Sequence, residues 1–383
     1  MHGLTTLNSF AADYDSWCAV GDPDRGYVMR FAESKLHCYG GAVRHSHELE
    51  TSATLACLSV RFALELMFFC SDGLKMEATL VERHLRLCLG ASPGFSRLST
   101  AAGSEPFLAK AAAQLINRRV DRKAAVRLLQ GCTNWIGYRC RAELVTSLLV
   151  MQARDIGHAE HHQREWVFIR DFMKALLPPD NYNVLMATLP ACHPDNQSAP
   201  FGTTFNDAKI WFNHVIRVDR GEMIHVRHLW KFVSRGAMII CPPGHHGIDI
   251  VLPVCFKGNA LSRNNMTAIL IQVKSDKHHP EDHSRNAFEH MNPFDVGLFS
   301  EEDAPLPVIR MVFALGSDAS GVTFPAAQEK SDLAGSFTSY DVWLAGLSPG
   351  TFACIGDDNL SAYRAVLGPF SSLRWELQDL EPL

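Results

Sequence analysis

The sequence lacks several short motifs that identify enzyme classes. It contains no G-x-x-x-x-G-K-[ST], G-x-G-x-x-G or H-E-x-x-H pattern, which argues against P-loop enzymes, dinucleotide-binding folds and zincins. Its 11 cysteines include no C-x-x-C pair, which argues against a zinc ribbon and a dithiol redox motif. ATP-dependent remodelling would need the missing phosphate loop.

The chain also lacks an excess of basic charge. Lys and Arg number 36 against 41 Asp and Glu, for a formal net charge of -5. The average surface therefore repels phosphate weakly, and a nucleic-acid contact would have to come from a local basic patch.

The N-terminal residues lack the features of a secretory signal. Residues 1–17 have neither a basic head followed by an apolar run nor an arginine-rich amphipathic pattern. We therefore expect an intracellular protein of the cytoplasm or nucleus, with reduced thiols.

A membrane span is also not expected. The most apolar long stretch, Ser52–Cys70, carries Arg61 and Glu65 four residues apart, as a helical ion pair would be. Charges inside an apolar run favour a buried helix of a soluble domain over a membrane span.

The first half of the chain shows helical periodicity. Apolar residues recur at helical spacing between about Leu55 and Leu177. The segments expected to be helical are residues 79–89, 105–116, 121–132, 141–157 and 164–177. We expect residues 1–188 to form an all-helical domain.

The second half has a different pattern. Residues 189–204 are rich in Pro, Asn, Ser, Gly and Thr and predict a linker. Residues 205–218 and 223–236 look mostly helical, and short β-branched runs predict strands at 237–241, 247–256, 266–275, 307–316, 340–347 and 352–357, with a helix over 280–292. The chain is therefore expected to be an α+β protein of two domains, with residues 205–383 forming an α/β domain.

Polar residues interrupt two of the predicted strands. Asp249 lies in the run GHHGIDIVLPV, and Gln272 and Lys274 lie in AILIQVKS. Gln272 and Lys274 share one face of their strand because side chains alternate between faces. Residues 257–266 suit a connection between adjacent antiparallel strands, which would bring Asp249 beside Gln272 and Lys274.

Charged groups in apolar strands cost several kcal/mol unless they are paired or bind a metal. Metal-assisted phosphodiester cleavage is one use for them. Asp249, the Gln272 carbonyl oxygen and the Val273 backbone carbonyl would hold Mg²⁺ or Mn²⁺, and Lys274 would orient the attacking water. Glu222 could add a second carboxylate.

This arrangement resembles the PD-(D/E)XK nuclease superfamily, whose core runs helix, strand, strand with the Asp, strand with (E/Q)-x-K, helix, strand. The matching residues are Asp249, Gln272 and Lys274, with Glu222 as the match to the helix acid. The run from His228 to Ser275 also resembles a large set of fungal proteins that carry the GID…IQVK pattern. The resemblance covers roughly residues 205–320 and implies a restriction-endonuclease-like domain with a mixed central sheet. Gln272 replaces the commoner Glu, which removes a charged ligand and should lower metal affinity.

Basic residues cluster near the predicted site. Arg227, Lys231 and Arg235 recur every four residues on the helical segment, and they form a candidate phosphate-facing patch. His245 and His246 precede the predicted strand that contains Asp249, where a histidine could act as an acid or base near the scissile phosphate, and His246 is a candidate contact to the nucleic acid.

The polar residues also fit two purely structural roles. Lys274 ends its strand as a solvated residue, or Asp249 caps a turn or pairs with Arg263. The leading functional hypothesis is a Mg²⁺-dependent nuclease-like protein that acts on DNA. The alternatives are an inactive nuclease fold that binds nucleic acid or protein, and a helical protein that binds a protein partner through residues 1–188.

Overall fold

The computed structural model describes residues 23–37, 51–64, 71–92, 98–103, 106–117, 125–130, 141–159, 166–193, 199–258, 261–275, 287–325 and 337–368. Its α-helices are α2 (Pro23–His37), α3 (Thr51–Phe62), α4 (Ser71–Arg83), α5 (Pro106–Asn117), α6 (Ala125–Gln130), α7 (Arg141–Ala159), α8 (Ile169–Leu176), α9 (Pro179–Ala187), α10 (Phe201–Thr204), α11 (Val226–Ser234) and α13 (Leu360–Leu367). The short 3-10 helices are η4 (Gly221–Ile224), η5 (Arg263–Asn265) and η6 (Asp357–Asn359).

The strands form a small hairpin and a large mixed sheet. The hairpin pairs β1 (Leu87–Ala91) with β2 (Leu98–Ala101). The sheet contains β3 (Val167–Phe168), β4 (Lys209–Ile210), β5 (His214–Arg217), β6 (Ala237–Ile240), β7 (Ile250–Cys255), β8 (Met266–Lys274), β9 (Val308–Ala314), β10 (Gly321–Thr323) and β11 (Ser339–Ala345). The protein is therefore a mixed α and β fold.

Five strands of the sheet lie side by side in the order of the sequence: β6, β7, β8, β9 and β11. Strand β7 is antiparallel to β6 and β8, whereas β8, β9 and β11 are parallel to one another. The expected antiparallel pairing of the strands that flank residues 257–266 is confirmed.

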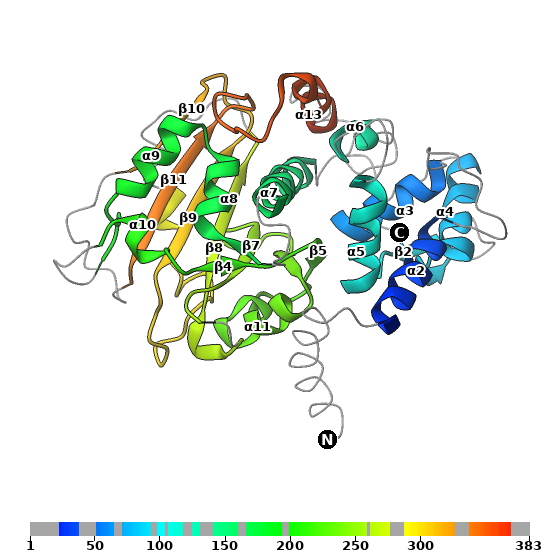
Figure 1. Ribbon diagram of the computed structural model, residues 1–383, viewed down its shortest axis with the longest axis horizontal. Coiled ribbons are helices and arrows are strands. Elements are labelled where there is room, and N and C mark those ends of the chain that lie inside the picture. Colours follow the sequence, from blue (N-terminus) through cyan, green and yellow to red (C-terminus); the bar gives the residue numbers. More distant parts are fainter. Residues whose placement is uncertain are drawn as a thin grey trace.

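The two faces of the sheet carry separate apolar clusters because side chains alternate along each strand. In β8, Ile269 and Ile271 belong to the cluster that includes residues of α7 and α8, and this side is called the α7 face below. Ala268 and Leu270 belong to the cluster that includes residues of α11, and this side is called the α11 face. Figure 1 shows α8 and α7 on one side of the strands and α11 below them.

The helices of the first half do not stand apart from the sheet. One apolar cluster runs from Leu36 and Leu58 in α2 and α3, through α7 and α8, to strand residues such as Ile271. In Figure 1, α7 lies between the sheet and the group formed by α2 to α6. The core thus continues across the position where the sequence suggested a boundary at residue 188.

The segment expected to be a linker is also packed. Phe201 begins α10 and is fully buried, and its ring lies 5.4 Å from that of Tyr340 in β11. Cys192 forms an isolated antiparallel bridge with Ser339 at the start of β11. Residues 189–193 and 199–204 therefore lie against the sheet.

Three expected elements were wrong. The helix expected over 79–89 ends at Arg83, because Leu85 adopts a left-handed φ of 58°, which a right-handed helix cannot contain. Residues Leu87–Ala91 form β1 instead. Residues 205–218 form β4 and β5 instead of a helix, since they pair with β7 and β6. Residues 352–357 form turns and the start of η6, not a strand.

Two other expected helices differ from the structure. The segment 164–177 divides into β3 and α8 within its described residues, and the helix expected over 280–292 ends at residue 289, while residues 280–286 lie outside the described part. Within the residues that the structure describes, no helix has the length and apolar character needed to cross a membrane.

Candidate functional site

The structure places Asp249 against the backbone between Gln272 and Lys274. Asp249 immediately precedes β7, its N–H donates to the carbonyl of Ile271 at 2.8 Å, and its own carbonyl accepts from Cys241 at 2.8 Å. The Val273 N–H donates to Asp249 Oδ2 at 2.6 Å. The Asp249 carboxylate thus replaces a backbone carbonyl as the acceptor of the next hydrogen bond between β7 and β8.

The Asp249 carboxyl is half-buried. Burial raises its pKa above the usual value, while the hydrogen bond from Val273 and the nearby His245 act in the opposite direction. Burial is the larger effect, so the folded site favours the protonated carboxyl. A bound divalent cation would favour the charged form.

Gln272, the residue before Val273 in β8, has an unpaired acceptor. Its Oε1 is buried and has no hydrogen-bond partner among the described residues. A buried acceptor without a donor costs about 1 to 3 kcal/mol, so its retention needs a reason. An amide oxygen is also a ligand that Mg²⁺ and Mn²⁺ accept.

Lys274 lies on the same strand face as Gln272, two residues further along β8. Its Nζ lies 5.7 Å from the centre of the Trp343 ring. Trp343 pairs with Val312 and Val312 pairs with Gln272, so lysine, indole and amide occupy neighbouring positions on the α11 face. The face of the Trp343 ring attracts the charged amine of Lys274 and holds it near the end of β8.

The turn before β7 is held by a close backbone approach. Gly247 has a φ of 77°, and a side chain there would meet the carbonyl oxygen of His290 at 1.8 Å. His246 is exposed, with its ring 5.0 Å from that of His290. His245 Nε2 lies 3.2 Å from the carbonyl of Val296. Only glycine fits at position 247, so this residue fixes the entry of the chain into β7.

Of the two histidines singled out before the predicted strand, His246 was chosen as the nucleic-acid contact, whereas His245 is the ring that acts electrostatically on Asp249. Its Nδ1 and Cε1 pack against Gly221, where an added methyl group would lie 2.9 and 2.8 Å away. Nothing in the pattern GHHGID distinguishes His245 from His246, because the distinction depends on the fold of the turn.

Glu222 lies apart from α11, on η4, and is exposed. Its carboxylate acts electrostatically on His228, whose pKa burial and basic neighbours lower. Glu222 therefore does not lie on helix α11, although the resemblance matches it to the helix acid. It directly follows Gly221, which contacts His245.

The basic residues Arg227 and Lys231 of α11, with Arg235 directly after it, form a stripe on the exposed side of the helix, called the α11 stripe. Arg227, Lys231 and Arg235 are all exposed, whereas Leu229 and Val233 are buried toward the sheet. Residues four apart lie on one side of a helix. The α11 stripe therefore faces away from the sheet, with Lys231 Nζ 5.8 Å from the Trp230 ring.

The alternative pairing of Asp249 with Arg263 does not occur. Arg263 Nη2 instead lies 2.9 Å from Asp303 Oδ1. Asp303 Oδ2 also accepts from the backbone and the hydroxyl of Ser300, at 2.8 and 2.6 Å. Burial acts to raise the pKa of Asp303, but the hydrogen bonds from Ser300 and Arg263 and the nearby His225 together outweigh it and lower the pKa to about 2.

The sequence also contains a G-x-S-x-G run at residues 346–350, directly after β11. A serine nucleophile of that type needs a strand, a sharp turn and a helix, with a histidine beside the hydroxyl. Here turns follow the run, and the Ser348 hydroxyl contacts the hydroxyls of Ser320 and Thr351. The run is a turn between β11 and the following segment.

The chemistry of the site depends on the atoms that it offers as metal ligands. In the part of the chain that the structure describes, no three His, Cys, Asp or Glu side chains gather as a metal-binding group. The site around Asp249 offers one carboxylate, one amide oxygen and the Val273 carbonyl, which faces the same edge of β8 as its N–H. Oxygen ligands of this kind fit Mg²⁺ or Mn²⁺ and leave positions for water and a phosphate oxygen.

Comparison of the chain with protein-family models, with curated proteins and with solved structures gives no match.

Proposed function

We propose that the chain is a nuclease-like protein that hydrolyses phosphodiester bonds of DNA with Mg²⁺ or Mn²⁺. One observation carries the proposal. The Asp249 carboxylate accepts a hydrogen bond from the backbone of Val273, directly between Gln272 and Lys274, and the side-chain oxygen of Gln272 is buried without a donor among the described residues.

The order of elements supports the proposal. Helix α11 is followed by β6, by β7 with Asp249 before it, by β8 with Gln272 and Lys274, by helical residues 287–289 and by β9. This is the order helix, strand, strand, strand, helix, strand of the superfamily that the sequence resembles.

Each residue has a distinct role in the proposed reaction. Asp249, Gln272 and the Val273 carbonyl would hold the cation, which when bound neutralises charge on a non-bridging phosphate oxygen. Lys274 positions the attacking water and stabilises negative charge at the phosphorus centre. The water oxygen forms the new bond to phosphorus and gives up a proton to solvent, the bond to the leaving oxygen breaks, and that oxygen takes up a proton from solvent.

Cleavage of supercoiled plasmid and of single-stranded DNA, with Mg²⁺ or Mn²⁺ added, tests this function. Wild type is expected to cut, and Asp249→Asn and Lys274→Ala are expected to cut at least about 100-fold more slowly. Asp207→Asn and Lys257→Ala are the matched controls, since both residues are exposed and lie near the other end of the β7–β8 pair. If wild type cuts no faster than the two site variants, the enzymatic proposal fails.

A second candidate is a nuclease fold that binds nucleic acid without cutting it. The exposed stripe of Arg227, Lys231 and Arg235 favours it, as does the neutral Gln272 where a charged ligand is commoner. Salt-dependent DNA binding that Asp249→Asn leaves unchanged, without cleavage by wild type, is the result that selects this candidate.

A further inference from the structure

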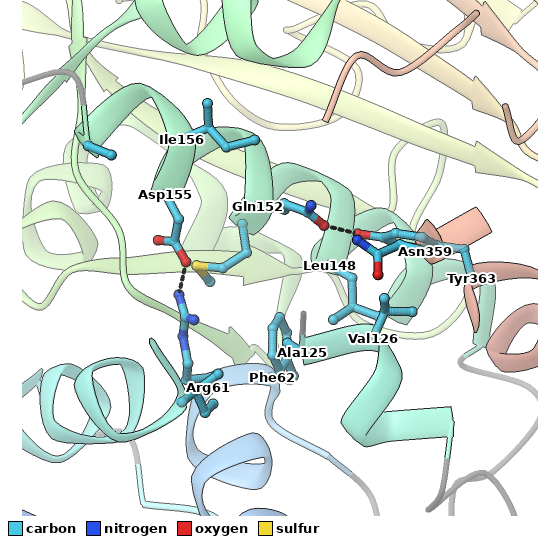
Figure 2. Close-up of a pocket in the computed structure, with 13 residues that line it drawn as sticks. Arg61, Phe62, Ala125, Val126, Leu148, Gln152, Asp155, Ile156, Asn359 and Tyr363 are labelled. Carbon is cyan, nitrogen blue, oxygen red and sulfur yellow. Dashed lines mark hydrogen bonds and ion pairs between the residues drawn. The ribbon is translucent and has the colours of Figure 1, made fainter. Parts of the chain in front are cut away.

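A cavity of about 410 Å³ lies between α7 and the helices α3, α5, α6 and α13. None of its lining residues belongs to the Asp249 site. Figure 2 shows its walls, with Arg61 and Asp155 at one end and Gln152, Tyr363 and Asn359 toward the other.

The size of this cavity separates it from a packing defect. Protein interiors leave few voids larger than one water molecule, whose share of liquid volume is about 30 Å³. Small-molecule sites typically measure about 300 to 1,000 Å³. A space of about 410 Å³ therefore falls in the range of a ligand site.

The middle of the cavity is apolar. Phe62, Val126, Leu148 and Met151 line it, and all four are buried. The cavity opens along the last turns of α7, where Ile156 is 41% exposed. A hydrophobic body would gain free energy by leaving water for this surface.

The two charged residues of the lining neutralise each other. Arg61 and Asp155 are the lining residues with a formal charge, and Arg61 Nη2 lies 2.9 Å from Asp155 Oδ2. Burial acts to raise the pKa of Asp155, but the guanidiniums of Arg61 and Arg154 outweigh it and the pKa is lowered. Asp155 therefore stays a carboxylate, and the ion pair adds no net charge to the wall.

Both members of this ion pair have further contacts in the fold. Arg61 Nε donates to the carbonyl of Asn213 at 3.3 Å. Asp155 Oδ1 lies 2.8 Å from Nη1 of Arg154, which does not line the cavity and whose guanidinium lies 5.0 Å from the centre of the Trp211 ring. The charged atoms at this end are thus engaged within the protein, and a charged ligand would compete with the existing bonds.

The polar groups at the other end also hold the fold together. The Tyr363 hydroxyl donates to Gln152 Oε1, and Gln152 Nε2 donates to the carbonyl of Cys354 at 2.7 Å. Asn359 Oδ1 accepts from Arg127 Nε at 2.7 Å. With its oxygen engaged, Asn359 can donate from its amide to a hydroxyl or carbonyl oxygen.

This lining discriminates between ligands by charge. An ionised ligand loses its water on entering the cavity and recovers little from a wall whose charges are already paired. A neutral ligand of the same shape avoids that loss and still gains from the burial of its apolar surface.

We propose that this cavity binds a neutral, largely apolar organic molecule with a hydroxyl or carbonyl oxygen, whose body fills the middle and whose oxygen accepts from Asn359. The site is independent of the proposed nuclease function. Its walls come from α3 of the first half and from α7 and α13. An occupant would therefore stabilise the contact between these helices.

Calorimetric titration of the full chain with 2-naphthalenemethanol tests the proposal. The comparison probes are 2-naphthoate and 2-naphthylmethylammonium, which have the same ring system with a negative and a positive charge. We expect saturable 1:1 binding of the alcohol and at least about tenfold weaker binding of both ions. Absence of saturable alcohol binding up to about 1 mM, or an ion that binds as tightly as the alcohol, would overturn the proposal.

Two variants place the alcohol in this cavity. Ala125→Trp fills the space from α6, and Ile156→Trp narrows its opening from an exposed position that tolerates a larger side chain. Each is expected to weaken alcohol binding at least about tenfold. Ala78→Trp is the matched control, at an exposed position of α4 outside the cavity. Circular dichroism checks that each variant is folded, and alcohol binding unaffected by a folded Ile156→Trp or Ala125→Trp would contradict the assignment.

A third variant tests the contact with the ligand oxygen. Asn359→Asp keeps an acceptor for Arg127 and removes the amide donor. We expect it to weaken binding of the alcohol about threefold or more, as the loss of one hydrogen bond does. Unchanged affinity in this variant would show that the ligand oxygen does not lie at Asn359.

Discussion

At the scale of single residues, the pKa of Asp249 makes a prediction about stability. A carboxyl whose folded pKa is raised binds its proton more tightly in the folded state than in the unfolded state. Its contribution to stability is complete below the unfolded pKa of about 3.9. That contribution is lost as the pH rises through the higher folded pKa.

Asp249→Asn should therefore be at least as stable as wild type at pH 7, because asparagine carries no charge to bury and its oxygen can still accept from Val273. Thermal unfolding of both proteins between pH 4 and pH 7 measures this. In the absence of divalent metal, wild type should lose more stability than the variant over this range. A variant with a clearly lower melting temperature at pH 7 would show that the charged carboxylate stabilises the fold.

Arg310 and Asp341 are charged residues in apolar strands, as Asp249 is, but these two residues pair with each other. Arg310 in β9 and Asp341 in β11 also interrupt apolar strands, and they form a two-bond ion pair with distances of 2.8 and 2.6 Å. Their side chains are 8% and 4% exposed. Arg310 also donates to the carbonyl of Phe288 at 2.6 Å.

Asp341→Asn should lower the free energy of unfolding by about 3 to 5 kcal/mol, because it leaves a buried guanidinium without its counter-ion. Arg263→Met is the matched comparison, since its pair with Asp303 has an arginine that is 54% exposed. That change should cost less than about 1 kcal/mol. Urea unfolding measures both, and equal losses would contradict the assignment of Arg310 and Asp341 to the core.

These residues show how far the sequence could predict the site. Alternation in β8 was enough to place Gln272 and Lys274 on one face. A charge in an apolar strand did not distinguish Asp249, which has no ion-pair partner among the described residues, from Asp341, which is paired across two strands. That distinction depends on which strands become neighbours, and strand neighbours are set by long-range contacts.

At the scale of elements, the turn before β7 determines where Asp249 lies. Gly247→Ala should lower the free energy of unfolding by more than about 2 kcal/mol, since it combines a left-handed φ of 77° with a contact to the His290 carbonyl at 1.8 Å. Gly244→Ala is the matched control, with a φ of 76° and no described atom within 4 Å of the added methyl group. It should cost only about 1 to 2 kcal/mol. Chemical denaturation compares the two, and equal costs would mean that the contact with His290 is not tight.

The α11 stripe leads to a prediction about DNA binding. The double variant Arg227→Ala with Lys231→Ala should reduce the slope of log affinity against log salt concentration by about 2, since each phosphate contact contributes about 0.9. Arg170→Ala with Lys174→Ala is the matched control on α8, which packs on the α7 face. Fluorescence anisotropy with a labelled duplex measures the slopes. A control that changes the slope as much as the α11 variant would place the DNA contact elsewhere.

Elements with strong local signals were predicted well, and elements fixed by pairing were not. The strands β6, β7, β8, β9 and β11 and the helices α5, α7 and α11 follow the pattern of their own residues. Strands β4 and β5 do not, because their apolar spacing also fits a helix and only pairing with β7 and β6 makes them strands. The left-handed Leu85 that ends α4 likewise carries no signal in the sequence.

At the scale of the whole molecule, the two halves share one core. The cluster that begins with Leu36 and Leu58 includes Phe172 in α8 and Ile271 in β8, so the helical half supports the sheet that holds Asp249. Composition changes near residue 189 suggested a boundary, but composition reports local polarity and not which surfaces pack together. The proposed metal site is therefore best tested in the full chain.

Binding of Mn²⁺ to the full chain, followed by electron paramagnetic resonance, tests the central claim most directly. The account predicts one bound Mn²⁺ per chain, lost or weakened at least about tenfold in Asp249→Asn and weakened in Gln272→Leu, with Asp207→Asn unchanged. A wild-type chain that binds no Mn²⁺, or one whose binding is the same in Asp249→Asn, would contradict it.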